Sequence, residues 1–168
     1  MGTGGCVMQI EMTIKGLMLD PVTTMPILIL RDENGQRMLP IWIGPNEAQA
    51  IASQIENEAP QRPMTHDLLR DVIQTLDGTV QKVVVCDLRD NTFFALIHLL
   101  VRGDPVTVDA RPSDAIALAL RTRAPIFVEE SVIDNAKTVE STPDRADTER
   151  LQKWLESLDA DDLGKYKM

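Results

Sequence analysis

The chain has 168 residues, of which 43% are apolar and 26% are charged, and this balance is typical of a globular domain rather than a disordered chain. The formal net charge is −9, so long-range repulsion of phosphate groups disfavours non-specific binding of duplex nucleic acid. No apolar run reaches the roughly 18 residues of a membrane span, and the N-terminus has no signal-peptide pattern. Both observations predict a cytoplasmic protein without a membrane partner.

Three strands are predicted near the start of the chain, from alternating or continuous apolar residues over 7–19, 25–30 and 37–43. Asn34-Gly35 is a strong hairpin signal between the second strand and the third. Pro40 has no N–H to donate to a neighbouring strand. The third strand is therefore expected at a sheet edge or with a bulge.

Two amphipathic helices are predicted after these strands. Pro45 suits the first turn of one helix, in which the carboxylate of Glu47 would favour the positive end of the helix dipole. Its core-facing stripe is expected to be Ala48, Ile51, Ala52 and Ile55. Thr65 is the expected N-cap of the other helix, and Asp77-Gly78 would end it. The expected buried face of this second helix is Leu68, Leu69, Val72, Ile73 and Leu76.

The second half of the chain predicts further strands over 80–88, 92–101, 106–109 and 126–128. Asp90-Asn91 has the residue types of a turn between the first two of them. A helix is predicted from Pro112 to about Arg123. Because this helix is apolar almost all round and rich in alanine, we expect it to pack closely in the interior.

Polar residues gather where the strand over 106–109 runs into that helix. Ser113 and Asp114 fall in the first helical turn and can bind its free backbone N–H groups. Arg111 is held extended by Pro112 and can reach a carboxylate with two hydrogen bonds. Two interpretations are open: a capping and ion-pair network that fixes the helix to the sheet, or an anion site whose carboxylates could hold a divalent metal.

Two histidines occur in the chain. His98 alternates with apolar residues on one strand face, which favours a structural role. His66 lies beside Asp67 at a helix start, where the dipole favours a neutral imidazole suited to act as a base or a ligand. The alternative for His66 is a surface residue of the first turn. Asp90-Asn91 is open to a similar pair of interpretations, turn chemistry or contact with a metal or phosphate.

Five segments of the chain resemble the bifunctional nuclease domain family, first catalogued as a bacterial domain of unknown function. In chain order they are residues 39–44 (LPIWIG), 62–69 (RPMTHDLL), 90–93 (DNTF), 111–119 (RPSDAIALA) and 124–128 (APIFV). The resemblance covers about residues 8–134. It implies an α+β fold: a compact single domain with a strongly bent, mixed or antiparallel sheet packed with three to four helices. It also implies a homo-oligomer, with a dimer favoured.

The family's plant members cut both DNA and RNA, so the resemblance implies a nuclease that hydrolyses phosphodiester bonds. The catalytic candidates are His66, Asp67, Asp90, Arg111 and Asp114. The substrate-binding candidates are Asn91, Arg111 and Ser113. The metal-binding candidates, for a divalent ion such as magnesium, are Glu47, Asp90 and Asp114. Among these, His66 would be the base and Arg111 the phosphate clamp.

A non-enzymatic module is the rival hypothesis, in which Arg111 binds a small anion or the chain acts as an oligomeric interaction module. Nucleic acid is a candidate partner that the net charge of −9 disfavours. Residues 135–168 are expected to form an acidic polar tail. One amphipathic helix is predicted in this tail over about 144–158, with Trp154 as its anchor.

Overall fold

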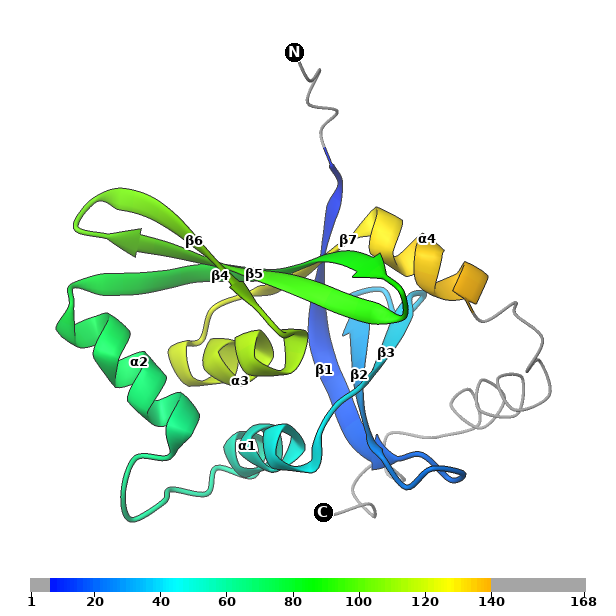
Figure 1. Ribbon diagram of the computed structural model, residues 1–168, viewed down its shortest axis with the longest axis horizontal. Helices are drawn as coiled ribbons and strands as arrows, with labels where there is room; N and C mark the ends of the chain where they lie inside the picture. Colours follow the sequence, from blue (N-terminus) through cyan, green and yellow to red (C-terminus); the bar gives the residue numbers. More distant parts are fainter. Residues whose placement is uncertain (1–6, 140–168) are drawn as a thin grey trace.

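The computed structural model describes residues 7–139, which form one seven-stranded sheet and four helices (Figure 1). The strands are β1 (Gln9–Leu19), β2 (Pro26–Asp32), β3 (Met38–Trp42), β4 (Gly78–Arg89), β5 (Thr92–Val101), β6 (Asp104–Ala110) and β7 (Ile126–Glu129). The helices are α1 (Pro45–Ile55), α2 (Thr65–Thr75), α3 (Pro112–Thr122) and α4 (Glu130–Val139). The predicted helix over about 144–158 lies outside the described residues.

The sheet has the strand order β3-β2-β1-β7-β4-β5-β6 and is mixed. All neighbouring strands are antiparallel except β4 and β7, which pair in parallel between Val83–Val85 and Ile126–Val128. Register shifts interrupt β1 beside β2 and occur twice in β4 beside β5, and such bulges increase the local twist of a strand. In Figure 1 the β1–β3 part of the sheet runs nearly across the β4–β6 part. The predicted α+β domain with a bent, mixed sheet is confirmed.

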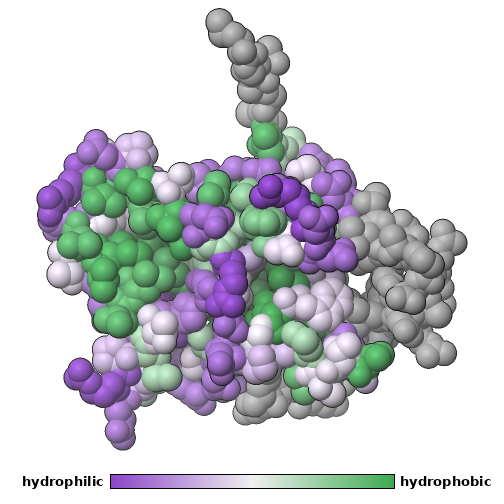
Figure 2. All heavy atoms as spheres, in the orientation of Figure 1, coloured by the Kyte–Doolittle hydropathy of each residue, from purple (hydrophilic) through white to green (hydrophobic). Residues whose placement is uncertain are grey.

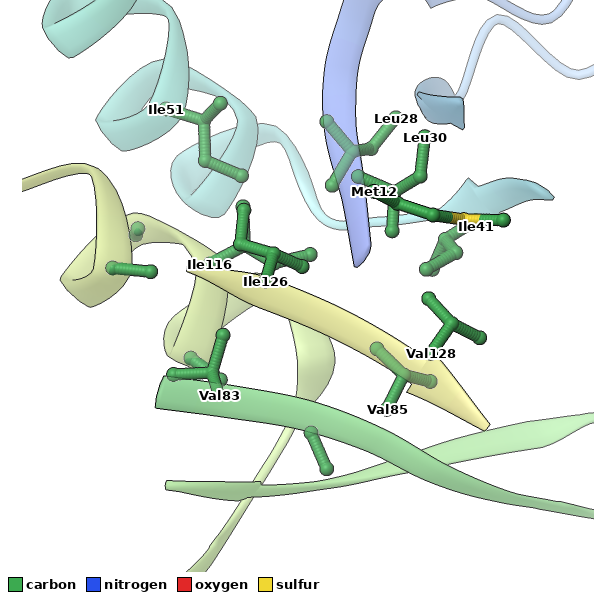
Figure 3. Close-up of a cluster of buried hydrophobic side chains, with 14 of the residues drawn as sticks. Met12, Leu28, Leu30, Ile41, Ile51, Val83, Val85, Ile116, Ile126 and Val128 are labelled. Carbon is green, nitrogen blue, oxygen red and sulfur yellow. The ribbon is translucent and has the colours of Figure 1, made fainter. Parts of the chain in front are cut away.

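The core lies in the angle between the two parts of the sheet. Met12, Leu28, Leu30 and Ile41 come from the first part, and Val83 and Val85 come from the second (Figure 3). Ile51 of α1 and Ile116 of α3 complete the cluster from the helical side. The side chains are fully or nearly fully buried, so the hydrophobic effect holds the two halves together.

Helix α3 occupies the centre of the helical layer, as its composition predicts. Residues 115–119 are buried on every side of the helix, and the small alanines allow α1 and α2 to approach closely. Pro112 is its first residue, and Arg111 is the N-cap. The helix ends at Arg123, whose left-handed φ of 56° is a common helix ending, two residues before Pro125.

Helix α2 corrects two expectations. Its N-cap is Met64 rather than Thr65, which is the first helical residue. The expected buried face is wrong for four of its five residues: Leu68, Leu69, Val72 and Leu76 are exposed, whereas Ile73 is partly buried against the core, and the buried residue of the helix is Asp67. The apolar period was correct, but a buried ion pair described below turns this face toward solvent.

One edge of the sheet is formed by the strand that the sequence predicts for an edge. Strand β3 is an edge strand, as Pro40 predicts, and it joins β2 through the hairpin at Asn34-Gly35.

In α1, Ala48 and Ile51 are buried as expected, whereas Ile55 at its end is exposed. Helix α4 was not predicted from the sequence. Within residues 7–139, no helix is both long and apolar enough to span a bilayer.

Candidate functional site

The first turns of α1, α2 and α3 meet through a chain of four polar side chains. Arg111 donates from Nε to Asp114 Oδ2 at 2.8 Å and from Nη2 to Glu47 Oε1 at 2.9 Å. The other oxygen of Asp114, Oδ1, lies 2.8 Å from Nε2 of His66. Four of the sequence candidates, separated by up to 67 positions in the chain, are thus in one connected network.

Local sequence explains how each side chain reaches this network. Gly44 is the N-cap of α1, and a Cβ at this position would collide with the Glu47 carboxylate, which folds back over the first turn. Pro45 and Pro112 begin α1 and α3, where a missing N–H costs no helical hydrogen bond. Because the N-termini of these helices carry partial positive charge, their acidic first-turn residues are stabilised there.

The network is graded from buried to exposed. The His66 side chain is only 12% exposed, whereas that of Arg111 is 65% exposed and presents part of its guanidinium to solvent. Burial would raise the pKa of Asp114, but hydrogen bonds from Arg111 and His66 outweigh it and hold this pKa below its usual value. The hydrogen bonds to Asp114 and Glu47 raise the pKa of Arg111. Arg111 and Asp114 are therefore both charged at neutral pH.

A second network lies deeper and fixes the helices relative to one another. Arg121, near the end of α3, donates from Nε to Asp67 Oδ1 at 2.7 Å and from Nη2 to the Ala50 carbonyl of α1 at 3.0 Å. Its Nη1 donates to the Ala117 carbonyl of its own helix. The other oxygen of Asp67 accepts the Met64 backbone N–H at 2.9 Å. This pair is almost completely buried, with Arg121 only 3% exposed.

Asp67 therefore has a partner different from that of its neighbour His66. Burial would raise the pKa of Asp67, but the Met64 N–H and Arg121 outweigh it and lower this pKa. Arg121 is not among the site residues that the sequence predicts. The signal that could have found it is a lone cation in the last turn of an otherwise apolar helix, which requires a buried acceptor.

The remaining candidates lie apart from the network or below the surface. Asp90 and Asn91 both have positive φ, of 50° and 60°, and form the two-residue turn between β4 and β5. Among the described residues, no side-chain hydrogen bond or ion pair joins either of them to Arg111, Asp114 or His66. Ser113 is buried in the first turn of α3.

The polar residues do not fit a metal centre. Within residues 7–139, no three His, Cys, Asp or Glu side chains are placed together to hold a metal ion. Glu47 and Asp114 both face the guanidinium of Arg111, which donates a hydrogen bond to each of them and would have to be displaced by a metal ion. No buried side-chain nitrogen or oxygen in the described part of the chain lacks a hydrogen-bond partner, so none of these atoms indicates a missing ligand.

Comparison with known proteins gives the context of this network. Residues 28–141, more than half of the chain, match the family model of the bifunctional nuclease domain. An uncharacterised protein of Mycobacterium tuberculosis is 39% identical over 164 residues, covering 91% of this chain and 97% of the relative. Bifunctional nuclease 2 of Oryza sativa subsp. japonica is 30% identical over 68% of this chain, and Bifunctional nuclease 2 of Arabidopsis thaliana is 29% identical over 69%. The chain spans 37% and 39% of those two plant proteins. It belongs to the bifunctional nuclease domain family.

Proposed function

We propose that the chain hydrolyses phosphodiester bonds of DNA or RNA at the network of Glu47, His66, Arg111 and Asp114. The observation that carries this proposal is the Asp114 carboxylate, which is shared between a largely buried histidine and an exposed arginine. An arginine that can meet a phosphate and a histidine held by a carboxylate are two recurring parts of phosphoryl-transfer sites. Family membership supports the same reaction class.

Arg111 and the neighbouring helix starts would bind the phosphate. The guanidinium is exposed on one side, and the first turns of α1 and α3 supply partial positive charge beside it. These positive groups are required because the chain as a whole carries −9 and repels nucleic acid at long range. A flexible single strand can bring one phosphate to such a site more easily than a duplex can, so single-stranded DNA and RNA are the proposed substrates.

His66 would act as the base. Since Asp114 is ionised and can only accept hydrogen bonds, Nε2 of His66 carries the proton in their contact, which leaves the lone pair of the neutral ring on Nδ1. In the proposed step, Nδ1 takes a proton from a water molecule while the water oxygen attacks phosphorus. The P–O bond to the departing strand end breaks, and that oxygen takes its proton from solvent. Arg111 would offset the negative charge on the phosphoryl oxygens.

The two histidines of the chain provide a matched test. Wild-type protein, His66→Gln and His98→Gln, purified identically, are incubated with end-labelled single-stranded DNA and RNA, in magnesium and in chelator. We expect His66→Gln to lose about 10²–10⁴-fold of the cleavage rate, because the base is absent. His98 lies on β5, outside the network, so His98→Gln should cleave at the wild-type rate. Equal cleavage by wild type and His66→Gln would refute this site.

Comparing the cleavage rate in magnesium with the rate in chelator tests whether the reaction depends on magnesium. The described residues assign no ligand set to a metal, so the proposed step contains no metal contact. Cleavage that persists in chelator is the outcome expected from the residues alone. Cleavage only with magnesium would instead indicate ligands supplied by the substrate or by another part of the chain.

A second candidate function is a binding module that recognises an anion without cleaving it. The observation in its favour is that both oxygens of Asp114 are already occupied and no buried polar side-chain atom of the described residues is unsatisfied. Such a closed network suits a structural or binding role. The same labelled oligonucleotides distinguish the two functions: binding that Arg111→Met abolishes, without any cleavage by wild type, would favour the module.

A further inference from the structure

Three large apolar side chains are buried on the face of the sheet that lies away from the core. Met18 of β1 and Ile27 and Ile29 of β2 are 1%, 0% and 1% exposed. Ile27 stands opposite Met18 on one side and opposite Trp42 of β3 on the other. We call the area formed by these four residues the outer β1–β3 face.

Strand alternation separates this face from the core. Leu28 and Leu30 alternate with Ile27 and Ile29 along β2 and belong to the core cluster on the opposite side of the sheet. Helices α1, α3 and α4 contribute their buried residues to that same cluster, and α2 packs against α3. Within residues 7–139, the outer β1–β3 face therefore has no covering helix.

Neighbouring side chains of the sheet cover this face only in part. Trp42 donates from Nε1 to Asp20 Oδ2 at 2.9 Å, which holds the indole across β2 toward β1. Val22 and Met25 of the adjoining turn are themselves exposed. Complete burial of an apolar sheet face requires a further layer stacked on it. Since the burial arises within one chain, this layer comes from its remaining residues, 1–6 or 140–168.

Reach decides between the two ends of the chain. Gln9 and Met18 are separated by nine residues of β1, about 30 Å, whereas residues 1–8 span at most about 26 Å. At the other end, the Glu130 N–H donates to the Met8 carbonyl, so α4 begins beside the start of β1. Residues 140–150 can span about 36 Å, which is longer than β1. In Figure 1, α4 lies on the same side of the domain as β2 and β3.

We infer that the outer β1–β3 face binds the C-terminal segment of its own chain, residues 144–158, as an amphipathic helix. Leu151, Trp154, Leu155 and Leu158 recur at positions i, i+3, i+4 and i+7, which gives this helix one apolar stripe. The stripe is about 11 Å long. It covers the two neighbouring rows of side chains on the face, which are about 7 Å apart.

The face has the size of a site for one helix. Gly16 lies opposite Ile29 and adds no side chain, which leaves room for a large ring such as the indole of Trp154. One row further along the strands, Thr13 stands opposite Arg31, and both are exposed. The apolar area therefore ends where the stripe of the helix ends.

The apolar side of α2 is the other surface that such a helix would fit. Leu68, Val72 and Leu76 are 57%, 46% and 56% exposed, and α2 lies within the hydrophobic area at the left of Figure 2. This side is open to water in the same chain in which the outer β1–β3 face is covered. In Figure 1, α2 and α4 lie at opposite ends of the domain. The inference is independent of the proposed hydrolysis, because it uses no residue of the Arg111 network.

A buried thiol tests whether the segment covers the face. In the full chain with Cys6→Ser and Cys86→Ala, Ile29→Cys should react slowly with a thiol reagent. Adding Leu155→Asp puts a charge into the stripe and should raise this rate by about tenfold or more, because the face opens to water. Leu163→Asp lies outside the stripe and is the matched control, which should leave the rate unchanged.

A second thiol separates local uncovering from general unfolding. Ile51→Cys lies in the core at the buried side of α1, and it should react slowly with or without Leu155→Asp. An Ile29→Cys rate that neither Leu155→Asp nor Trp154→Asp changes would overturn the inference. Equal acceleration at Ile29→Cys and Ile51→Cys would also count against it, since a local cover protects only the outer face.

Cross-linking of the unmodified chain identifies which copy supplies the segment. Lys15, next to Gly16 on β1, should be joined to Lys153 by a short amine-reactive cross-linker, whereas Lys82 on β4 should not. When isotopically heavy and light protein are mixed, the Lys15–Lys153 product should carry a single isotope, because each segment binds its own chain. A product of mixed isotopes would assign the contact to a second copy and overturn the inference, as would the absence of this cross-link.

Discussion

Arg121 is the residue on which the arrangement of the helices depends most. Its buried guanidinium contacts three helices: Asp67 of α2, the Ala50 carbonyl of α1 and the Ala117 carbonyl of its own α3. A charge removed from water is costly unless it is paired and hydrogen-bonded, and Arg121 meets both conditions. The buried pair also places His66, the neighbour of Asp67, against Asp114.

Replacing this residue therefore leaves a buried charge behind. Arg121→Met should destabilise the protein by about 3–5 kcal/mol, because Asp67 keeps its desolvation cost and loses its partner. The measurement is urea unfolding followed by circular dichroism. Arg102→Met is the control: it breaks an exposed pair with Asp77 and should cost less than about 1 kcal/mol.

The double variant Arg121→Met with Asp67→Leu distinguishes the cause. If the buried unpaired carboxylate is responsible, removing it should restore part of the lost stability. A double variant that is less stable than Arg121→Met alone would contradict this explanation.

Among the elements, helix α2 shows what a periodic pattern can and cannot specify. Its apolar residues recur with helical spacing, and the helix is where the sequence predicts it. The spacing defines one apolar side, but it does not determine whether that side meets this chain's own core. Here the Asp67–Arg121 pair sets the rotation of the helix, and this pair joins residues 54 positions apart, so no local pattern could reveal it.

The β4–β5 hairpin offers a stabilising change at the scale of one element. Asn91 has a φ of 60° in the turn, a conformation that glycine adopts without strain. Asn91→Gly should raise stability by up to about 1 kcal/mol, measured as a higher urea midpoint with an unchanged slope.

The same variant tests whether Asn91 takes part in substrate binding. If Asn91 is only a turn residue, nuclease activity should be unchanged or higher in Asn91→Gly. If Asn91→Gly is more stable but less active than wild type, Asn91 takes part in substrate binding.

For the whole molecule, most of the fold was predictable because it follows local signals. Strand alternation, Asn34-Gly35 and the prolines at helix starts all act within a few residues. The network of Glu47, His66, Arg111 and Asp114 was predicted as a set of candidates, but their contacts required the tertiary structure. Helix α4 was missed because the composition turns polar after Ile133, so Val132 and Ile133 are the main apolar signal of its buried side.

Three aspartate side chains predict how the stability of the folded protein changes at acid pH. Asp20, Asp67 and Asp114 all have pKa values below the ordinary 3.8: burial acts to raise each one, and hydrogen bonds outweigh it. For Asp20 the largest of these comes from Trp42. A carboxyl whose folded pKa is depressed stabilises the fold above its unfolded pKa and loses that contribution as pH falls through the folded value.

Stability should therefore decline as pH is lowered below 3.8, measured as the urea midpoint across a pH series. Asp67→Asn should flatten this decline, because one of the three groups no longer titrates. Glu129 acts in the opposite direction and at higher pH: burial and the nearby Asp87 raise its pKa above 4.5, so its protonation stabilises the fold as pH falls toward 4.5, and Glu129→Gln should remove that gain without changing the decline below 3.8. An identical slope in wild type and Asp67→Asn would contradict the assignment.

The central place of β7 has a consequence for the order in which the chain can fold. Strand β1 pairs with β7, with Gln9 opposite Glu129, and β4 pairs with β7 on its other side, in parallel. During synthesis the first and fourth strands leave the ribosome long before the strand that joins them, so both expose an unpaired edge until β7 arrives. Such long-range pairings slow folding, and a chain stopped before residue 126 would expose two open sheet edges that invite aggregation.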